Sequence, residues 1–171
     1  RLSIQNDPDG APILLLDGQK HRLSLSISHR DGLAFCAVCE ADGVSLGADV
    51  ERVERRSAAF AGDYFTPAEL ESMGSLFDGG YERMVTLIWS AKEAALKALG
   101  KGLRLDTRSV EIRGIRAAES GWGSFSVRCG LTAGAWRGWW QARGEYILTL
   151  ATLTQSGDRA AIRLVEIDQH G

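Results

Sequence analysis

Cysteine, proline, net charge and long hydrophobic runs are all scarce in this sequence. Its 171 residues include 3 cysteines and 3 prolines, and they carry a formal net charge of −2. A chain so close to neutral is not a general nucleic-acid binder, so an anionic ligand would have to be held by a local cluster of cations. No apolar run approaches membrane-spanning length, and the start has no signal-peptide pattern. The sequence therefore predicts neither a nucleic acid nor a membrane as a partner.

The few cysteines also argue against a disulfide framework or a metal-binding thiol pair. Cys36 and Cys39 form a C-x-x-C pattern, but they lie inside the apolar run 33–39. On a strand, side chains three apart point to opposite faces, whereas redox and zinc motifs sit in loops or at helix starts. We therefore expect buried thiols and a reducing, cytoplasmic location.

What the sequence does contain is the composition of one ordinary globular domain. Hydrophobic residues make up 44% and charged residues 25%, enough for a real core. The chain begins with Arg1 rather than Met, which indicates an artificially delimited, processed or partial polypeptide.

The order of the predicted elements is strands, two helices, then more strands. Turn signals at Asp17-Gly18 and Asp31-Gly32 separate the early strands. The strands are predicted at 13–16, 23–27, 33–39, 44–51, 109–115, 124–129, 135–142, 146–153 and 161–167. This order favours an α+β fold with a mainly antiparallel sheet packed against a long central helix. The tryptophans of the 136–140 run are expected to pack in the sheet and core.

The two helices are predicted from their termini and periodicity. Thr66-Pro67 with Glu69 three residues after the cap is typical of a helix start, and this helix should end near Met73. The second helix is predicted over 81–99 and stops at Gly100. An apolar face should pack, and a different face should present Trp89, Lys92, Glu93 and Leu96.

Acidic side chains on one strand and on the long helix form the candidate site. Asp49 and Glu51 are two apart on a predicted strand, so they point the same way. Adjacent carboxylates repel, and a divalent metal with a preference for hard oxygen ligands, such as Mg²⁺, removes that penalty. Glu93 supplies a third carboxylate, with Lys92 and Lys97 nearby to neutralise phosphates. A solvated strand face and a plain surface helix are the alternative readings of the same residues.

Two segments together resemble the signatures of the 4′-phosphopantetheinyl transferase superfamily. They are residues 47–51 (Gly-Ala-Asp-Val-Glu) and residues 89–97 (Trp-Ser-Ala-Lys-Glu-Ala-Ala-Leu-Lys). Ser28-His29 and the Phe65 to Glu69 segment match two further elements of the larger, surfactin-synthetase-activating type, and Gly10-Ala11-Pro12 is a weak match to another. The order of the elements is that of the family.

The resemblance implies transfer of the 4′-phosphopantetheine arm of coenzyme A to a serine of an acyl or peptidyl carrier protein, with release of 3′,5′-ADP. It implies that Mg²⁺, or alternatively Mn²⁺, binds to Asp49, Glu51 and Glu93. Coenzyme A phosphates would contact Ser28, His29, Lys92 and Lys97. Glu93 and Lys97 would be catalytic: the first takes the serine proton, and the second offsets charge on the leaving group. Glu69 is read first as a helix cap and second as a catalytic group.

The chain departs from the family pattern in two ways. Ala11 stands where the larger type often has a phosphate-contacting lysine, for which Lys20 or Arg22 could substitute. The second departure is length: residues 1–46 form a shortened N-terminal half that carries the Ser-His element. Residues 47–171 form a C-terminal half with the metal and coenzyme A site. A missing N-terminal portion, a reduced first half or a second subunit are the open alternatives, and a domain of a polyketide or fatty acid synthase multienzyme is one possible source.

Three functions compete at this stage. The first is an active holo-[acyl-carrier-protein] synthase, the second is a carrier-docking module without catalysis, and the third is an unrelated metal-dependent nucleotide-binding protein. For carrier recognition the candidates are Arg52, Arg55, Arg56 and the stretch 58–65, because carriers present an acidic helix. An ordinary solvated loop is the alternative.

Overall fold

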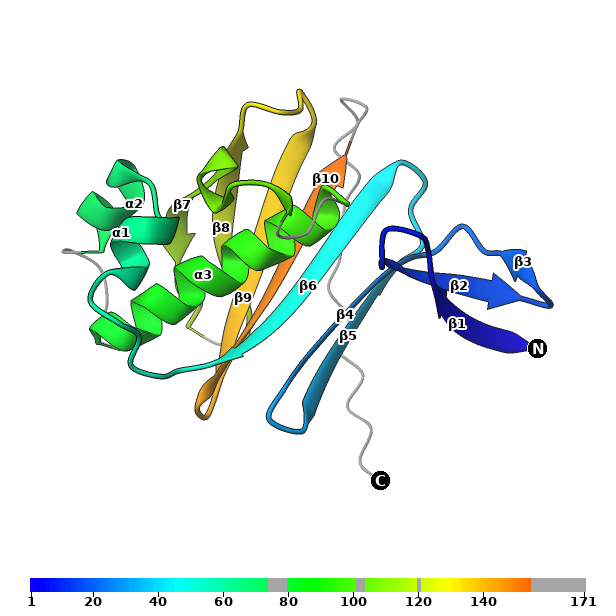
Figure 1. The fold of residues 1–171 in the computed structure, drawn as a ribbon, viewed down its shortest axis with the longest axis horizontal. Coiled ribbons are helices and arrows are strands. Elements are labelled where there is room, and N and C mark those ends of the chain that lie inside the picture. The colour runs from blue at the N-terminus through cyan, green and yellow to red at the C-terminus, as the bar shows by residue number, and fades with distance from the viewer. Residues whose placement is uncertain (74–79, 101–103, 120, 155–171) are drawn as a thin grey trace.

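The computed structural model describes residues 1–73, 80–100, 104–119 and 121–154. The strand expected at 161–167 lies outside these residues. The described residues contain ten strands and three α-helices (Figure 1). The strands are β1 (Leu2–Asn6), β2 (Pro12–Leu16), β3 (Gln19–Lys20), β4 (Ser24–Arg30), β5 (Leu33–Cys39), β6 (Val44–Arg52), β7 (Val110–Arg116), β8 (Gly123–Cys129), β9 (Ala135–Arg143) and β10 (Tyr146–Thr154). The helices are α1 (Phe60–Tyr64), α2 (Pro67–Ser72) and α3 (Tyr81–Ala98).

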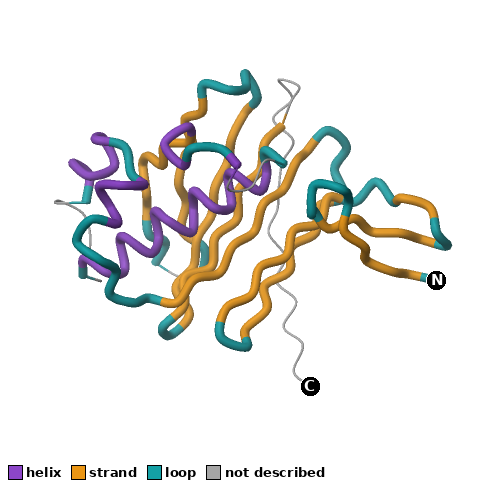
Figure 2. The backbone as a smooth tube through the Cα atoms, viewed as in Figure 1, coloured by secondary structure: helices purple, strands orange, loops and turns teal. Residues whose placement is uncertain are grey.

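A five-stranded antiparallel sheet is the centre of the molecule. Its order is β6-β10-β9-β8-β7, and α3 packs across one face, with α1 and α2 at one end (Figures 1 and 2). The predicted α+β class, with an antiparallel sheet against a long helix, is thereby confirmed.

Gly47 allows α3 to approach β6 closely. A Cβ atom at this position would lie 1.8 Å from the carbonyl oxygen of Ala94 and 2.7 Å from the amide nitrogen of Ala98. Both are backbone atoms, which cannot move away as the end of a flexible side chain could. Glycine therefore fixes which face of β6 the helix covers, and Asp49 and Glu51 lie on that same face because strand side chains alternate.

The long helix is buried far more completely than the sequence indicates. Its bounds match the prediction, but twelve of its residues are buried, including Lys92 and Leu96. The prediction that Trp89, Lys92, Glu93 and Leu96 form one ligand-facing surface is wrong. Sheet strands and the segment before β7 enclose the helix, so only a narrow strip remains partly exposed.

The β4–β5 hairpin lies along the free edge of β6, on the side away from β10 (Figure 1). Serine side chains make the connection, since Ser24 Oγ donates to the Val44 carbonyl at 2.7 Å and Ser26 Oγ accepts from the Ala48 amide at 2.8 Å. An edge strand with unpaired backbone groups is a site for aggregation, and the hairpin satisfies part of that edge.

The hairpin turns follow the predicted chemistry. Asp17-Gly18 and Asp31-Gly32 all have positive φ, between 49° and 82°, as a two-residue primed turn requires. The sequence did not reveal β1, β3 or α1. Cys36 is exposed rather than buried, so the expectation for this thiol is wrong. The three cysteines are all free.

The N-terminal strands β1, β2 and β3 form a separate small sheet that projects from the rest (Figure 2). The boundary predicted between residues 46 and 47 falls inside β6, and the division into two halves stays a prediction. None of the helices in the described ranges is long and apolar enough to cross a bilayer.

Candidate active site

Asp49 lies at the centre of a buried polar cluster between β6, β4 and α3. Its side chain is 5% exposed. Oδ1 accepts from Ser28 Oγ at 2.9 Å and from Lys97 Nζ at 2.8 Å, and Oδ2 accepts from Ser90 Oγ at 2.8 Å. Three charged or hydroxyl donors from two other elements thus hold one carboxylate, which fixes its position without a bound ligand.

Glu51, two residues further along the same face, has a different set of partners. Oε2 accepts from Arg56 at 3.1 Å and lies 3.8 Å from Arg30, while Oε1 accepts from the Trp89 indole at 3.3 Å. Burial and then the nearby Asp49 charge raise the pKa of Glu51, and the two arginines oppose that rise. Glu51 is therefore turned toward cations of the protein itself.

Glu93 of α3 is the carboxylate that lacks a partner. Its Oε1 atom is buried and has no hydrogen bond among the described residues. Burial, followed by the Asp49 charge, raises the pKa of Glu93 to about 7, and Lys97 opposes the shift. A carboxylate with a pKa near neutrality and a free oxygen can accept a proton at physiological pH.

Lys97 approaches the cluster from the last turn of α3. Besides its ion pair with Asp49, Nζ donates to the Ala48 carbonyl at 2.9 Å. The side chain is 28% exposed, so it remains accessible to an anionic ligand. Its predicted position beside the acidic groups agrees with the structure.

The three carboxylates are neighbours, but they do not converge on one point. No group of three or more His, Cys, Asp or Glu side chains in the described ranges is arranged to hold a metal ion. The donor set nevertheless suits a hard cation, since all three ligands are carboxylates and one has an unpartnered buried oxygen. The residues fit Mg²⁺ in kind, and Glu51 is the member turned toward other partners.

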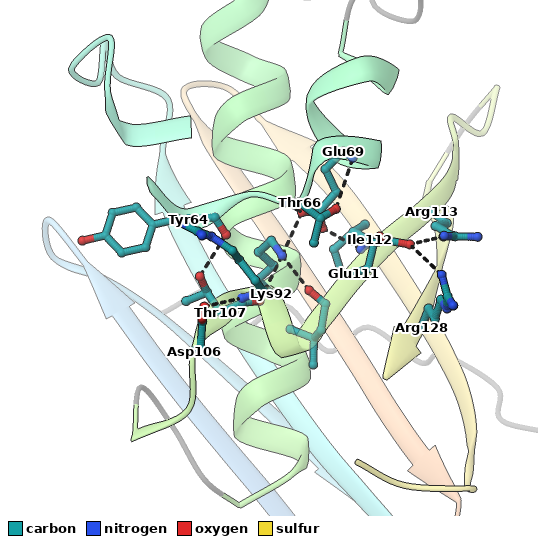
Figure 3. A network of polar contacts seen from close by, with 12 residues as sticks. Tyr64, Thr66, Glu69, Lys92, Asp106, Thr107, Glu111, Ile112, Arg113 and Arg128 are labelled. Carbon is teal, nitrogen blue, oxygen red and sulfur yellow. Dashed lines mark hydrogen bonds and ion pairs between the residues drawn. The ribbon is translucent and has the colours of Figure 1, made fainter. Parts of the chain in front are cut away.

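Lys92 is not part of this cluster, which corrects its predicted role as a phosphate ligand. Its side chain is fully buried, and Nζ forms an ion pair with Glu69 at 2.8 Å. It also donates to the carbonyls of Thr107 and Val110 at 3.0 and 2.6 Å (Figure 3). Lys92 immediately precedes Glu93, and the rotation of about 100° between consecutive helix residues turns it away from the partly exposed strip, so it ties α3 to α2 and β7 instead.

Glu69 is confirmed as a helix cap. Thr66 Oγ1 accepts from the Glu69 amide and Glu69 Oε2 accepts from the Thr66 amide, which is a complete capping box. Its other oxygen accepts from the Ile112 amide at 2.7 Å (Figure 3). All of these contacts are structural, so Glu69 has no free oxygen for chemistry.

The predicted Ser28–His29 pair is split by the strand on which it lies. Ser28 faces β6 and donates to Asp49, whereas His29 is exposed. Adjacent strand residues point to opposite faces, so His29 does not join Ser28 beside the carboxylates. Ser28 thus belongs to the cluster, while the predicted phosphate contact of His29 stays a prediction and would lie on the other face of β4.

The basic segment after β6 is only partly available for docking. Arg52 pairs with Glu145 at 2.9 Å, and Arg56 is turned inward to Glu51. Arg55 is exposed, and Tyr64 is 39% exposed, whereas Ala61 and Phe65 are buried. The exposed members of the predicted carrier patch are Arg52, Arg55, Ala58, Ala59, Gly62, Asp63 and Tyr64.

Comparison with known proteins identifies the family of the chain. The family model of the 4′-phosphopantetheinyl transferase superfamily matches residues 45–151, which include β6, α3 and all three carboxylates. The chain belongs to this superfamily.

Two curated relatives are similar over about half of this transferase-superfamily chain. 4′-phosphopantetheinyl transferase HetI of Nostoc sp. is 32% identical over 94 residues, 55% of this chain and 40% of the relative. A 4′-phosphopantetheinyl transferase of Bacillus subtilis is 29% identical over 91 residues, 53% of this chain and 39% of the relative. The aligned part of the chain thus spans less than half the length of these relatives.

Solved structures of the superfamily share the fold. A holo-(acyl-carrier-protein) synthase from Bacillus anthracis, in complex with CoA (3′,5′-ADP), has a TM-score of 0.54 and 20% identity. The match covers 66% of this chain and 96% of that one. The corresponding synthase from Neisseria meningitidis has a TM-score of 0.52 and 22% identity, over 64% of this chain and 96% of its own.

Several members of the candidate site were not predicted from the sequence. Ser90 bridges Asp49 and Thr149, with 2.8 Å to each, and Arg30 and Arg56 bind Glu51. Ser90 lies one turn before Glu93 and Ala94 on the helix, which is a signal that could have pointed to it. Nothing local to Arg30 or Arg56 distinguishes them from surface arginines.

Proposed function

We propose that this chain transfers the 4′-phosphopantetheine arm of coenzyme A to a serine of an acyl or peptidyl carrier protein and releases 3′,5′-ADP. Superfamily membership supports the class of reaction. The observation that supports the site is Glu93: a buried carboxylate with one unpartnered oxygen, a pKa of about 7, and Asp49 and Lys97 beside it.

The roles follow from these contacts. Glu93 accepts the proton of the carrier serine hydroxyl through an oxygen that has no hydrogen-bond partner among the described residues. Lys97, held by Asp49 and the Ala48 carbonyl but still partly exposed, binds the coenzyme A diphosphate. The attack is on the β-phosphorus, and the leaving 3′,5′-ADP carries the charge that Lys97 offsets. Ser28 and Ser90 orient Asp49.

Asp49, Glu51 and Glu93 would hold Mg²⁺, with Mn²⁺ as an alternative. When bound, this ion supplies positive charge that neutralises the diphosphate. Coenzyme A binding by His29 remains a prediction, and it would require the ligand to reach the exposed face of β4. Arg55 and Tyr64 are the proposed contacts of the carrier protein.

Intact-mass analysis tests the proposal. The chain is mixed with coenzyme A, Mg²⁺ and an apo acyl carrier protein, and in parallel with an apo peptidyl carrier. We expect one phosphopantetheine to be added per carrier, and no addition when EDTA is present. Modification of the acyl carrier alone would identify a holo-[acyl-carrier-protein] synthase of narrow range.

The same assay separates the competing functions. A chain that binds the carrier but adds no mass would be a docking module, and the proposal would be wrong. A chain that binds ADP as well as coenzyme A in calorimetry, without acting on a carrier, would be an unrelated nucleotide-binding protein.

A further inference from the structure

Arg56 occupies an unusual position for an arginine in a connecting segment. Its guanidinium lies 4.5 Å from the centre of the Phe60 ring and 5.7 Å from that of Trp89. The same group donates to Glu51 Oε2 at 3.1 Å, and the side chain is only 16% exposed. An arginine stacked on aromatic rings is well placed to hold a carboxylate.

Arg30 also lies near Glu51 but is tied to other residues. It pairs with Glu54 at 2.9 Å and approaches Asp31 at 3.7 Å, while Glu51 is 3.8 Å away. In the described parts of the chain, Arg56 has Glu51 as its acidic partner. Loss of Glu51 therefore leaves Arg30 paired and frees Arg56.

The two oxygens of Glu51 are already in use. Arg56 binds Oε2 and the Trp89 indole binds Oε1, so both oxygens of Glu51 already have partners. This explains why the acidic groups are neighbours without converging on one point. A cation that needs a Glu51 oxygen must compete with the guanidinium for it.

Arg56 also borders a cavity that can accommodate a different position of its side chain. Arg56 lines a cavity of about 420 Å³ between the segment after β6 and the start of α3. Glu54 and Glu82 also line this cavity and offer alternative carboxylates. The guanidinium can thus leave Glu51 without becoming an unpaired charge.

We propose that Arg56 is an internal counter-cation for Glu51, which a divalent cation displaces when it binds the acidic cluster. This inference rests on the proposed function, because it takes the carboxylates to be the metal site. Arg56 is a positioning residue: it keeps Glu51 in place before the ion binds, and it lowers the affinity for the ion by competition.

Calorimetric titration with Mn²⁺ alone, without coenzyme A or carrier, tests the inference. Arg56→Gln removes the competing charge, and we expect it to bind Mn²⁺ at least about fivefold more tightly than the unaltered chain, because an exposed ion pair can reach that effect and this pair is mostly buried. Arg56→Met, which retains apolar packing on Phe60 and Trp89, should do the same. Arg56→Lys retains the charge and should bind as the unaltered chain does.

Arg55→Gln is the matched control. It removes the same charge from the preceding residue, whose side chain is exposed. Its Mn²⁺ affinity should not change. Weaker or equal binding by both neutral Arg56 variants overturns the inference, even if the unaltered chain transfers phosphopantetheine normally. If the unaltered chain binds no Mn²⁺, the inference and the metal site both fail, and the carrier assay then reports separately on transfer.

Discussion

At the scale of single residues, Glu93 is held in a state that is unfavourable for its charge. The carboxyl is buried next to Asp49 and Glu51, which disfavours ionisation, and only Lys97 and Arg56 offset this. A group that must lose its proton to act as a base therefore does so near pH 7 in the folded chain. The chemistry and the stability of the protein should both depend on this one proton.

Glu93→Gln should abolish phosphopantetheine transfer while the fold persists, because the amide matches the shape of the acid but cannot accept the serine proton. Single-turnover assays with intact-mass detection measure the loss. Glu71→Gln, an exposed glutamate of α2, is the control and should retain activity. Near-normal turnover in the Glu93 variant would show that another group takes the proton.

The same substitution should change how stability depends on pH. The pKa of Glu93 is raised by folding, so the folded state binds the proton more tightly than the unfolded chain does. Stability from this group is therefore full below about pH 4.5 and is lost as pH rises through about 7. The rise of the Glu93 pKa from 4.5 to about 7 corresponds to about 3 kcal/mol at pH 8. Glu93→Gln should therefore melt about 6–12 °C higher than the unaltered chain at pH 8, and the difference should vanish at pH 4.5. Equal melting temperatures at pH 8 would contradict the burial of an ionised group.

Lys97→Ala should slow turnover about 100-fold, the usual cost of losing one charged group that stabilises a transition state. The side chain is partly exposed, so folding should be affected less than catalysis. Arg128→Ala removes a cation that is 70% exposed on β8 and should leave turnover unchanged. If Lys97→Ala retains nearly normal kcat, the lysine does not contact the reacting phosphates.

The acidic residues could be predicted at this scale, and one of the lysines could not. Asp49 and Glu51 share a face because strand side chains alternate, and Glu93 faces them from α3. The role of Lys92 was predicted wrongly because helical periodicity gives the direction of a side chain but not the residues that surround it. Glu69, distant in sequence, makes a buried site for an ammonium group that local pattern cannot reveal.

At the scale of elements, the buried pair of Lys92 and Glu69 joins two helices to the edge of the sheet. Burial lowers the pKa of Lys92, and the Glu69 carboxylate opposes that shift. The pair is fully hydrogen-bonded, through the Thr107 and Val110 carbonyls on one side and the Thr66 and Ile112 amides on the other. Breaking such a pair leaves an uncompensated charge in the interior.

Lys92→Met should therefore destabilise the chain by about 3–5 kcal/mol, measured by urea unfolding. Arg128→Met makes the same kind of change on the exposed face of β8 and should cost little. If Lys92 bound coenzyme A instead, its variant would lose coenzyme A affinity without a large loss of stability, and the structural role would be refuted.

Gly47 provides a second test of how α3 is placed on β6. Gly47→Ala puts a Cβ atom 1.8 Å from the Ala94 carbonyl oxygen, so helix and strand must separate. We expect a loss of at least about 3 kcal/mol, at the upper end of the cost of overpacking.

Gly62→Ala is the matched control for Gly47→Ala. It lies in α1, and a Cβ atom there would meet no heavy atom within 4 Å. The alanine should be neutral or stabilise by about 1 kcal/mol, because glycine is the poorer helix former. Similar thermal stability of the two variants would mean that helix and strand are not in close contact.

Element bounds were predicted well wherever a local signal defines them. The Thr66-Pro67 cap, the glycine after α3 and the aspartate-glycine turns all give such signals. Strand β1 and helix α1 lack them: β1 depends on pairing with β2, and the cap of α1 makes no side-chain hydrogen bond. Tertiary contact, rather than propensity, creates these two elements.

At the scale of the whole molecule, the site is shared between the central sheet and the N-terminal hairpin. A solvated face was one reading of the 44–51 strand, yet Ala48 and Val50 are buried on one face and Gly47 and Asp49 on the other. A strand that is buried on both faces must be covered by other elements, and the alternating sequence pattern does not predict which ones. The β4–β5 hairpin is one of them, because its serines reach the free edge of β6 and Ser28 continues to Asp49.

Ser26→Ala should uncouple this hairpin from the sheet. Ser26 is buried, and its hydroxyl is the acceptor for the Ala48 amide, so the variant leaves that amide without its partner. We expect a loss of about 1–3 kcal/mol in urea unfolding and faster hydrogen exchange at the Ala48 amide. Transfer should also slow, because the displaced hairpin no longer brings Ser28 to Asp49.

Ser126→Ala removes a hydroxyl that bonds the Arg113 carbonyl at an exposed position, and it should change stability by less than about 0.5 kcal/mol. The contrast between the two serines isolates the contribution of the hairpin from that of a hydroxyl in general. If Ala48 exchanges at the same rate in Ser26→Ala as in the unaltered chain, the edge of β6 is satisfied in another way. The link from the β4–β5 hairpin to Asp49 would then depend on Ser28 and not on Ser26.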